Sequence, residues 1–349
     1  MNFKFETLTA VHIGSGEILS PYSDYVFDNG FVYYLDHDLL VKELIKRPNS
    51  DELLERFIMV VKNQAKGSSS NRFKLKSFLE EAGLDYKNCA LKKVKVHDEV
   101  RVEIQKHIST SGQPYIPGSS LKGAIRTALI CFFPGISEET LRKKSGYIGE
   151  DIFGKFGDDV LKYLHISDTT PFKDENLAIA KFCRFNLETL KRTIPIVSEV
   201  IPKGSATTFN IKTTAREGNV KEGFAFLNAG KEDLLLEIIN RYSVKNIEIE
   251  LEQLKKYRNN VTNDIIGFYT GLLEEINKAD SKKEAYLRIG SGKTYYFNSI
   301  AQKLPKSNLH QIISKTFKKA NPNLFPKTRT FIFEGEYSEV PGWVKITKI

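Results

Sequence analysis

The sequence predicts an α+β fold for this chain of 349 residues. Apolar and polar residues alternate near the N-terminus, at residues 2–13, which is typical of a strand, and another short strand is expected near the C-terminus at residues 330–333. Helical spacing of apolar residues dominates between them, above all over residues 231–278. Strands and helices mix without the regular alternation of a doubly wound sheet, so an α/β fold is not expected.

The N-terminal strand and the hairpin after it are the clearest local elements. Within residues 2–13 the apolar side chains fall on one face, and His12 falls on the polar face. His12 is therefore either an acid–base residue or a hydrogen-bonded surface histidine. Residues 25–33 predict a hairpin, because Asn29-Gly30 is a strong signal for a two-residue turn between strands.

Helices are expected between this hairpin and the next strands. Apolar spacing and the boundary residues Pro48 and Gly83 predict three of them. They occupy residues 38–47, 51–64 and 73–82, and the glycine- and serine-rich residues 67–71 between the second and third are expected to form a flexible loop. We therefore expect a helical insertion at about residues 38–90.

Composition points to a soluble protein with a polyanionic partner. The chain carries 52 Lys and Arg against 43 Asp and Glu, a net charge of +9, which suits nucleic acid. Three scattered cysteines form no Cys-x-x-Cys pair, so neither disulfides nor a zinc site are expected. The sequence shows neither a membrane span nor a signal peptide, which predicts a cytoplasmic protein.

Two aspartates invite a catalytic interpretation. Asp98 follows His97 at a break between two short strands within residues 94–104, and adjacent strand residues point to opposite faces, so a turn is the better explanation. Asp168 ends a strand expected at residues 161–166 and is followed by Thr169, Thr170 and Pro171. Such an aspartate is usually a turn or cap residue, so we expect it to be non-catalytic.

Residues 115–133 predict the helix around which the chain is organised. Pro117-Gly118 makes a turn, Ser119 or Ser120 offers an N-cap oxygen, and apolar residues then recur at helical spacing. Lys122 and Arg126 share the opposite face, and Gly123 would let a ligand approach the backbone. The helix start and the basic pair make a candidate phosphate cradle. The alternative is an ordinary amphipathic helix with two solvated cations.

This helix resembles the glycine-serine helix of the RAMP superfamily, the RRM-like proteins that build CRISPR effector complexes. Three other segments resemble signatures of the same superfamily. They are the histidine-apolar-glycine run His12-Ile13-Gly14, the short run Ile152-Phe153-Gly154, and the strand Glu199-Val200-Ile201-Pro202-Lys203-Gly204 with a returning strand at residues 207–213. Lys203 and Lys212 on these last strands are either backbone contacts for RNA or solvated lysines.

A glycine-rich stretch near the C-terminus resembles another RAMP feature. Gly292-Lys293-Thr294 suggests nucleotide binding, but a P-loop needs a glycine where Leu287 stands, so ATP binding is not expected. The glycine amides of Gly290 and Gly292, with Arg288 and Lys293, would instead contact phosphates of single-stranded RNA. Tyr295 is the candidate stacking residue, although an aromatic cluster such as residues 295–297 more often belongs to a core.

Two motifs near the end of the chain indicate which family within the RAMP superfamily the sequence resembles. Pro326-Lys327-Thr328-Arg329 followed by Pro341-Gly342-Trp343 resembles the fifth-subunit family of the type III-A Csm complex, which caps the RAMP filament at the 3′ end of the guide RNA. The resemblance implies two RRM-like (ferredoxin-like) modules, interleaved and elaborated by insertions. We expect them at residues 1–160 and 161–349.

The resemblance implies a non-catalytic RNA-binding subunit, without cofactor or metal, that holds the 3′ part of the guide RNA (crRNA) and has a role in crRNA maturation. Its expected partners are crRNA, the adjacent RAMP subunit of the complex, and host nucleases that trim the 3′ end. The alternative is a metal-independent RAMP endoribonuclease, which needs a histidine beside a Lys, Tyr or second His. The candidate RNA-binding residues are Gly118, Ser119, Ser120, Lys122, Arg126, Lys203, Arg288, Gly290, Gly292, Lys293, Tyr295, Lys327 and Arg329.

Overall fold

The computed structural model describes residues 1–65, 74–96, 98–132, 150–155, 157–173, 176–216, 218–220, 222–335 and 337–349. Helices and four sheets are mixed along the chain, which confirms the α+β class. Among the described helices, none combines the length and the apolar character that crossing a bilayer requires. The expected loop at residues 67–71, together with His97, lies outside the described residues.

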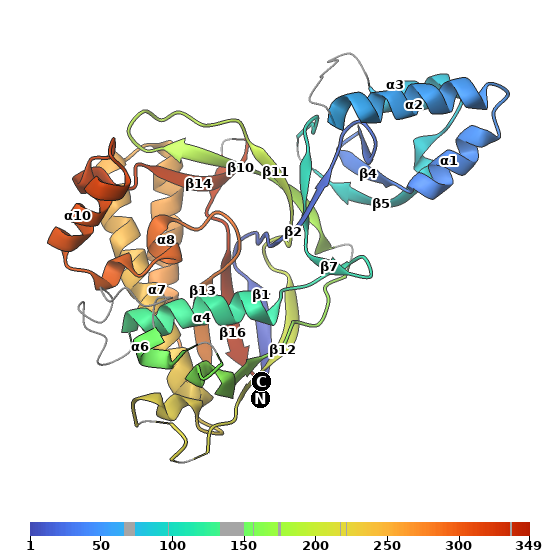
Figure 1. Ribbon diagram of the computed structural model, residues 1–349. Helices are drawn as coiled ribbons and strands as arrows, with labels where there is room; N and C mark the ends of the chain where they lie inside the picture. Colours follow the sequence, from blue (N-terminus) through green and yellow to red (C-terminus); the bar gives the residue numbers. More distant parts are fainter. Residues whose placement is uncertain are drawn as a thin grey trace.

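The first sheet has a ferredoxin-like arrangement. Its strand order is β13 (Glu284–Arg288), β16 (Trp343–Lys348), β1 (Asn2–Thr7), β12 (Ala206–Thr213) and β9 (Leu164–Ile166), and all neighbours are antiparallel. Because β1 and β9 are both antiparallel to β12, they run parallel to each other. The helix α4 (Gly118–Phe132) lies between them in the chain and completes a split β-α-β unit. Figure 1 shows α4 running across these strands.

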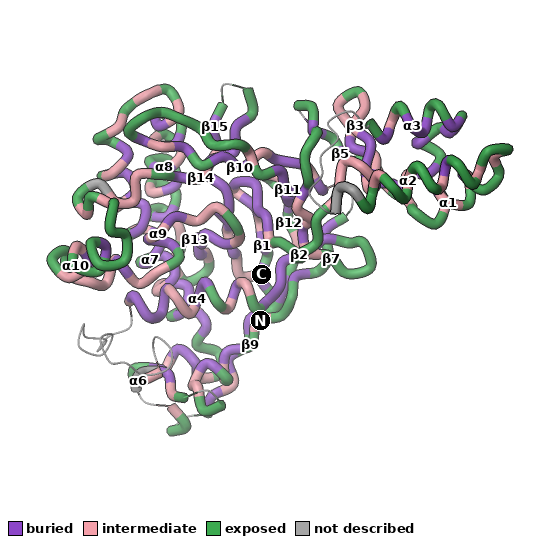
Figure 2. Tube along the Cα trace, turned by 45° about the horizontal axis from the view of Figure 1, so that its top comes forward, coloured by how far each residue is buried: buried purple, intermediate pink, exposed green. Residues whose placement is uncertain are grey.

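The predicted apolar face of α4 packs on this sheet. Leu121, Ile125 and Leu129 are fully buried and belong to one core with Phe3 and Phe5 of β1. The long helix α7 (Glu232–Leu254) covers the same core with its N-terminal half. Figure 2 shows the buried residues concentrated along the strands and on the helix faces turned toward them.

The second sheet has six strands. Its order is β15 (Tyr337–Glu339), β14 (Thr328–Glu334), β10 (Ala178–Asn186), β11 (Ile196–Val200), β6 (Ile104–His107) and β2 (Gly14–Leu19), with only β11 and β6 parallel. The C-terminal half of α7 and the helix α8 (Asn260–Lys278) pack on it. Trp343 is fully buried in this second core and makes edge-on ring contacts with Tyr269 and Phe297.

A three-stranded sheet and three helices form an arm that projects from the body at the upper right of Figure 1. The strands are β3 (Tyr25–Asp28), β4 (Phe31–Leu35) and β5 (Ala90–Lys95), and the helices are α1 (His37–Ile45), α2 (Ser50–Ala65) and α3 (Leu75–Glu81). The hairpin β3–β4 is confirmed, with Asn29 and Gly30 both at positive φ. The arm has its own core around Leu40, Leu44 and Phe78.

The remaining elements are short. They are the strands β7 (Ser109–Thr110) and β8 (Gln113–Pro114), the helices α6 (Glu150–Phe153), α9 (Tyr295–Asn298) and α10 (Lys306–Thr316), and the 3-10 turns η1 (Tyr86–Cys89), η2 (Val160–Tyr163), η4 (Glu222–Leu227), η5 (Lys255–Tyr257), η6 (Ala301–Lys303) and η7 (Pro322–Leu324).

Two expectations differ from the structure. Both large sheets take strands from either side of residue 160, as the pairing of β1 with β12 and β16 shows, so they do not correspond to segments 1–160 and 161–349. The strand expected over residues 2–13 ends at Thr7, and His12 is buried at 2% exposure instead of lying on a polar face. The chain bends there because it passes from the first sheet into the second.

Candidate nucleic-acid interface

The N-terminus of α4 is capped by a carboxylate from another strand connection. The Gly118 amide donates to Asp168 Oδ1 at 2.8 Å, and Ser119 and Ser120 lie inside the first helical turn. The predicted serine N-cap is therefore wrong, and Asp168 is a cap residue as expected. A Cβ at Gly118 would stand 2.2 Å from the Ile166 carbonyl oxygen, so this glycine serves close packing against β9.

The basic pair of α4 faces the protein. Lys122 Nζ donates to the carbonyl oxygens of Leu161 and Leu164, both at 2.8 Å, and burial lowers its pKa. The guanidinium of half-buried Arg126 lies 5.4 Å from the centroid of the Phe153 ring. Because Asp168 occupies the helix N-terminus and Lys122 is engaged by carbonyls, this geometry does not form the expected phosphate cradle.

The glycine-rich loop after β13 is held by Arg288. This residue is 2% exposed, and its guanidinium donates to the carbonyl oxygens of Pro341 at 2.9 Å and Gly292 at 3.0 Å, and to the Tyr269 hydroxyl at 3.2 Å. Direct contact of Arg288 with RNA phosphate, as expected from sequence, does not fit this burial. Arg288 instead stabilises the backbone of the glycine-rich loop through these hydrogen bonds.

Both loop glycines have positive φ, +70° at Gly290 and +82° at Gly292. The close approach they permit is to the protein itself. A Cβ at Gly290 would stand 2.3 Å from the His12 carbonyl oxygen, and one at Gly292 would stand 2.6 Å from Pro341 Cγ. These glycines therefore allow close internal packing, and the contact of their amides with phosphates stays a prediction.

Three of the sequence signatures meet at this point. Ser291 N donates to the His12 carbonyl at 2.8 Å, Ile289 N donates to the Gly342 carbonyl at 2.8 Å, and Gly342 N donates to the Ala10 carbonyl at 2.8 Å. The histidine-apolar-glycine run, the glycine-rich loop and the Pro-Gly-Trp run are thus bonded to one another at the junction of the two large sheets.

Lys293 and Tyr295 follow the loop and differ in their surroundings. Lys293 is half-buried, and burial together with the charge of Arg288 lowers its pKa. The Tyr295 ring makes an edge-on contact with Phe325 at 5.0 Å and packs against the cluster around Leu309 and Ile313. Tyr295 is thus largely a packing residue, whereas Lys293 stays a candidate contact.

The remaining predicted cations also separate into buried and exposed positions. Arg329 is 2% exposed, and its Nε pairs with Glu250 Oε2 at 2.7 Å, so a direct RNA contact does not fit its burial. Lys327 forms a surface ion pair with Glu188 at 2.7 Å. Lys203 is exposed in the turn after β11. Exposure is therefore compatible with an RNA contact at Lys203 and Lys327.

A feature that the sequence reasoning missed lies in residues 285–333. This acid-free segment contains no Asp or Glu, and its nine basic residues equal the net charge of the whole chain, +9. A count of charges along the printed sequence would have found it. The nine are Arg288, Lys293, Lys303, Lys306, Lys315, Lys318, Lys319, Lys327 and Arg329.

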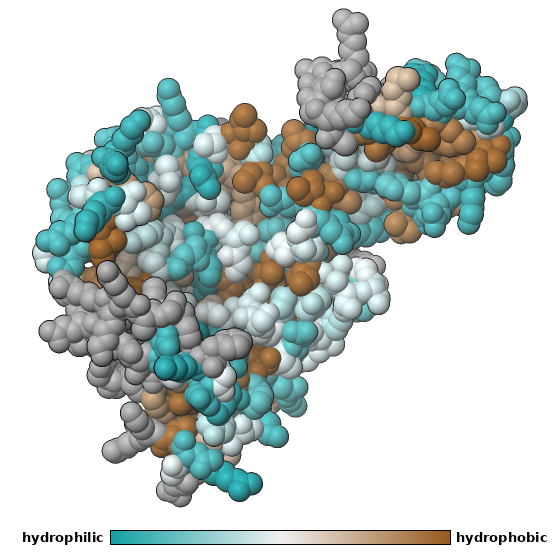
Figure 3. Space-filling model, in the orientation of Figure 1, coloured by the Kyte–Doolittle hydropathy of each residue, from teal (hydrophilic) through white to brown (hydrophobic). Residues whose placement is uncertain are grey.

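Three exposed lysines of this segment have no carboxylate partner among the described residues. Arg329 and Lys327 are paired with Glu250 and Glu188, as described above. Within the described part of the chain, Lys306, Lys318 and Lys319 form no ion pair. All three are exposed; Lys306 begins α10, and Lys318 and Lys319 follow its end. Hydrophilic side chains dominate the surface around α10 at the left of Figure 3. Unpaired cations at a surface favour binding of a polyanion.

Aromatic rings lie among these lysines. The Phe317 ring is 42% exposed and stacks on Phe325 with centroids 4.9 Å apart and an interplanar angle of 30°. Together with Lys318, Lys319 and Lys327 the two rings line a hollow of about 610 Å³, the lysine–phenylalanine hollow, whose full lining is residues 316–321 and 325–328. Lysines around an exposed aromatic ring are the combination that binds single-stranded nucleic acid.

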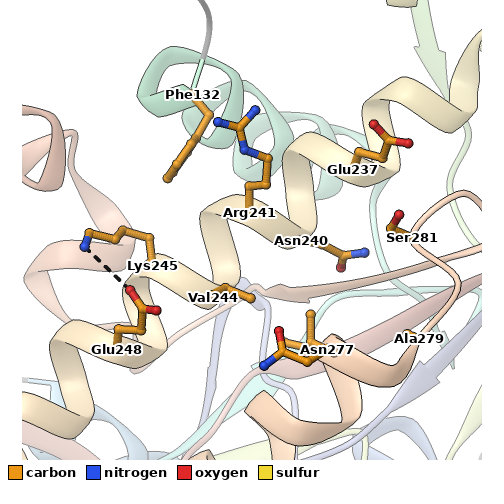
Figure 4. A pocket seen from close by; sticks show the side chains of 11 residues that line it. Phe132, Glu237, Asn240, Arg241, Val244, Lys245, Glu248, Asn277, Ala279 and Ser281 are labelled. Atoms are coloured by element: carbon orange, nitrogen blue, oxygen red, sulfur yellow. Dashed lines mark ion pairs between the residues drawn. The ribbon is translucent and has the colours of Figure 1, made fainter.

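Another hollow, of about 550 Å³, lies between α7 and the end of α8 and is shown in Figure 4. Arg241 and Lys245 line it, but so do Glu237 and Glu248, and Lys245 pairs with Glu248 at 3.5 Å. Its positive and negative side chains balance, so it should attract the phosphates of a nucleic acid less strongly than the lysine–phenylalanine hollow does.

Two histidines that are distant in sequence meet in the body of the protein. The rings of His12 and His107 lie 5.9 Å apart. His107 accepts a hydrogen bond from Ile13 N through Nδ1 at 3.1 Å and reaches the Tyr115 carbonyl through Nε2 at 3.1 Å, so both ring nitrogens are used. Burial lowers the pKa of His107 to about 4 and lowers that of His12. These neutral, buried rings do not favour the endoribonuclease alternative.

Comparisons with known proteins agree on one family. The RAMP superfamily model matches residues 4–295, most of the chain. A Methanocaldococcus jannaschii protein described as "CRISPR system Cms protein Csm5" is 27% identical over an alignment of 399 positions that covers 100% of this chain and 89% of that protein. A Streptococcus thermophilus protein of the same description is 26% identical over 60% of this chain and 63% of that protein.

Solved structures show the same fold. A chain of the "Cryo-EM structure of Csm-crRNA-target RNA ternary complex in type III-A CRISPR-Cas system" has a TM-score of 0.73 at 22% identity, covering 99% of this chain and 100% of that one. The "Crystal structure of T.onnurineus Csm5" has a TM-score of 0.64 at 21% identity, with 98% and 99% covered. The fold, the order of the sequence signatures and the match over residues 4–295 lead to one conclusion: this chain belongs to the RAMP superfamily.

Proposed function

We propose that this protein is a non-catalytic RNA-binding subunit of a type III-A CRISPR effector complex. In this role it holds the 3′ part of the crRNA, caps the RAMP filament and contributes to crRNA maturation. The observation that carries the proposal is the acid-free segment, which places unpaired lysines around the exposed Phe317 ring. The full-length similarity to a protein described as Csm5 supports the assignment to this complex.

Binding through this surface is mainly electrostatic and independent of sequence. Lysines contact phosphates, and phosphate contacts fix the position of a strand without reading its bases. For a single strand, each neutralised phosphate contributes about −0.7 to the slope of log affinity against log salt. We therefore expect affinity to fall steeply with salt and to vary little among unrelated single-stranded sequences.

The test uses two matched pairs of exposed lysines. Changing Lys318 and Lys319 to Ala should lower affinity for single-stranded RNA on the order of tenfold at physiological salt and reduce the salt slope by about 1.4. Lys278 and Lys282 are also exposed but lie outside the acid-free segment, so their alanine variant should bind normally. Equal affinity of both variants, or a flat salt dependence of the natural protein, would refute the proposal.

The other partners implied by this role are the neighbouring RAMP subunit and host nucleases that trim the 3′ end. An apolar hollow of about 460 Å³ at the edge strand β2 supports a protein contact, because Ile18, Ile194 and Ile196 line it and are exposed. Hydrophobic residues gather between the body and the arm in Figure 3. An Ile194→Glu variant should therefore assemble poorly into the complex while binding RNA normally.

Absence of catalysis is tested separately. Pure protein incubated with labelled repeat RNA should bind it without producing discrete cuts. Cuts that disappear in a His12→Ala variant would replace the proposal by the endoribonuclease alternative. In a reconstituted complex that lacks this subunit, the 3′ end of the crRNA should become accessible to added exonuclease.

A further inference from the structure

A cavity of about 410 Å³ lies where the arm meets the six-stranded sheet. The arm contributes Tyr34 of β4 and Lys92 of β5, and the body contributes His107 of β6 and Glu199 of β11. Such a volume falls within the range of roughly 300–1,000 Å³ that small-molecule sites occupy. The cavity is separate from the lysine–phenylalanine hollow, and the proposed contacts to phosphates do not involve it.

The Tyr34 hydroxyl is the unexplained group in this cavity. The residue is 5% exposed, and its hydroxyl has no hydrogen-bond partner among the described residues. Burial, the charge of Glu199 and the direct approach of that carboxylate raise the pKa of this hydroxyl well above its usual range, so it keeps its proton. A buried polar group without a partner is unfavourable and uncommon in native proteins. Tyr34 therefore offers a hydrogen-bond donor, beside the Glu199 carboxylate, to whatever enters the cavity.

Glu199 offers an acceptor beside it. The residue is 2% exposed, and its Oε2 already accepts a hydrogen bond from His107 N at 2.8 Å. Its Oε1 faces Lys92 Nζ at 3.5 Å, the long limit of a hydrogen bond, so it keeps capacity to accept. Lys92 Nζ also lies 4.8 Å from the centroid of the Tyr34 ring, which places a cation at the cavity wall.

The rest of the wall is mixed. Leu19, Leu35, Leu91 and Leu177 supply its apolar surface, and Asp24, His37, Lys106 and Ser109 supply further polar groups. Asp24 pairs with His37 at 3.0 Å, and Lys106 pairs with Glu17. A ligand that fits has a flat apolar body, one edge that both donates and accepts hydrogen bonds, and an attached anion. A nucleotide has these properties, and single-stranded RNA is commonly recognised through bases that leave the stack and enter protein pockets.

We propose that this cavity binds one unstacked nucleobase of single-stranded RNA, with its edge on Tyr34 and Glu199 and its phosphate on Lys92. That the base belongs to crRNA rests on the proposed function, whereas binding of a nucleotide in the cavity does not depend on that function. The site would fix the register of one nucleotide along a strand that the surface lysines hold without reading.

The experiment compares Tyr34→Phe with Tyr33→Phe. The control removes a hydroxyl from the preceding residue of the same strand, whose side chain contacts Tyr86 in the arm instead of the cavity. A single abasic nucleotide is moved along a single-stranded RNA, and affinity is measured at each position. For the natural protein and Tyr33→Phe, one position should cost about tenfold in affinity. Tyr34→Phe should bind intact RNA about as weakly as this abasic RNA and show no further loss.

The melting temperature of the Tyr34→Phe variant shows whether the Tyr34 hydroxyl has a structural role. Removing an unpartnered buried hydroxyl should leave the melting temperature of the free protein unchanged or raised. A lower melting temperature in Tyr34→Phe, with RNA affinity lowered equally at every abasic position, would mean that the hydroxyl supports the fold, and the inference would be overturned.

The remaining outcomes separate this inference from the proposed function. If RNA binds but no abasic position matters, the inference falls and the proposed function stands. If no RNA binds, the proposed function fails, and ligand-detected NMR with AMP, GMP, CMP and UMP decides on the cavity. Saturable binding of a mononucleotide that Tyr34→Phe abolishes supports the inference, and its absence overturns it. Defective assembly of Tyr34→Phe with normal RNA affinity would show that a protein segment fills the cavity, which also overturns it.

Discussion

Variants of the buried ion pair Arg329–Glu250 test whether the Pro-Lys-Thr-Arg run stabilises the fold or binds RNA. Both side chains are 1% exposed, and Arg329 also donates to the carbonyl oxygens of Pro326 at 2.6 Å and Thr328 at 3.1 Å. In Arg329→Met the Glu250 carboxylate keeps, among the described residues, the hydrogen bond that it accepts from Thr294 Oγ1 at 3.1 Å. Removing one partner of a buried ion pair costs about 3–5 kcal/mol, because the other charge stays buried without compensation.

This loss of unfolding free energy should lower the melting temperature by a measurable amount. Unfolding entropy of about 2.1 cal/mol/K per residue gives about 0.7 kcal/mol/K for 349 residues, so the melting temperature should fall by about 4–7 °C. Circular dichroism during heating measures it. RNA affinity at 20 °C should stay unchanged. The double variant Arg329→Met/Glu250→Leu removes both charges and should melt within about 3 °C of the natural protein.

Lys327→Met provides the matched control two residues away. Lys327 and Glu188 form an exposed pair, with side chains 37% and 45% accessible, and exposed pairs contribute about 0–1 kcal/mol. This variant should therefore melt almost normally yet bind RNA more weakly, because Lys327 lines the lysine–phenylalanine hollow. If Arg329→Met instead bound RNA about tenfold more weakly with an unchanged melting temperature, the assignment of Arg329 as a structural residue would be wrong.

Three further predictions concern the glycines and the buried histidine. Gly123 is exposed in α4, and a Cβ added there would meet open space, so Gly123→Ala should raise the free energy of unfolding measured in urea by about 1 kcal/mol. A fall in RNA affinity would instead support the interpretation from the sequence that a ligand approaches the backbone at Gly123. Gly290→Ala should lower stability by about 3 kcal/mol, because its Cβ meets the His12 carbonyl at positive φ; normal melting would contradict this packing. His107 has a folded pKa of about 4, so the unfolded chain binds more protons between pH 6.5 and 4, and stability should fall by about 2 kcal/mol from pH 7.5 to 5. His107→Asn should flatten this dependence in urea titrations, and an unchanged slope would refute it.

Local elements could be predicted from the sequence because their signals are local. The hairpin around Asn29-Gly30 and the helix after Gly118 follow from turn chemistry and apolar spacing, and both are present. The sheets could not be predicted in the same way. β1 pairs with β12 and β16, strands from the middle and the end of the chain, and no periodicity within a segment encodes that choice.

The candidate site was predicted less well, for a physical reason. A cation in the sequence does not reveal whether a carboxylate or carbonyl will meet it in the fold. Arg329 finds Glu250 79 residues away, and Lys122 finds two carbonyls about 40 residues away. Both were expected to contact RNA, and both are engaged by the protein. The acid-free segment is the reverse case, since lysines with no acidic residue nearby in sequence had fewer local partners to find.

The signatures that resemble the RAMP family and the surface proposed to bind RNA are therefore different parts of the molecule. Residues around His12, Gly290 and Gly342 are bonded to one another through backbone groups at the junction of the sheets. Such bonds depend on the backbone path and on the absence of a Cβ, so they define a fold. Phosphate contacts need only flexible cations at a surface, as Lys318 and Lys319 provide. The order of the signatures thus identifies the family, whereas the charge left unpaired after folding indicates where a polyanion would bind.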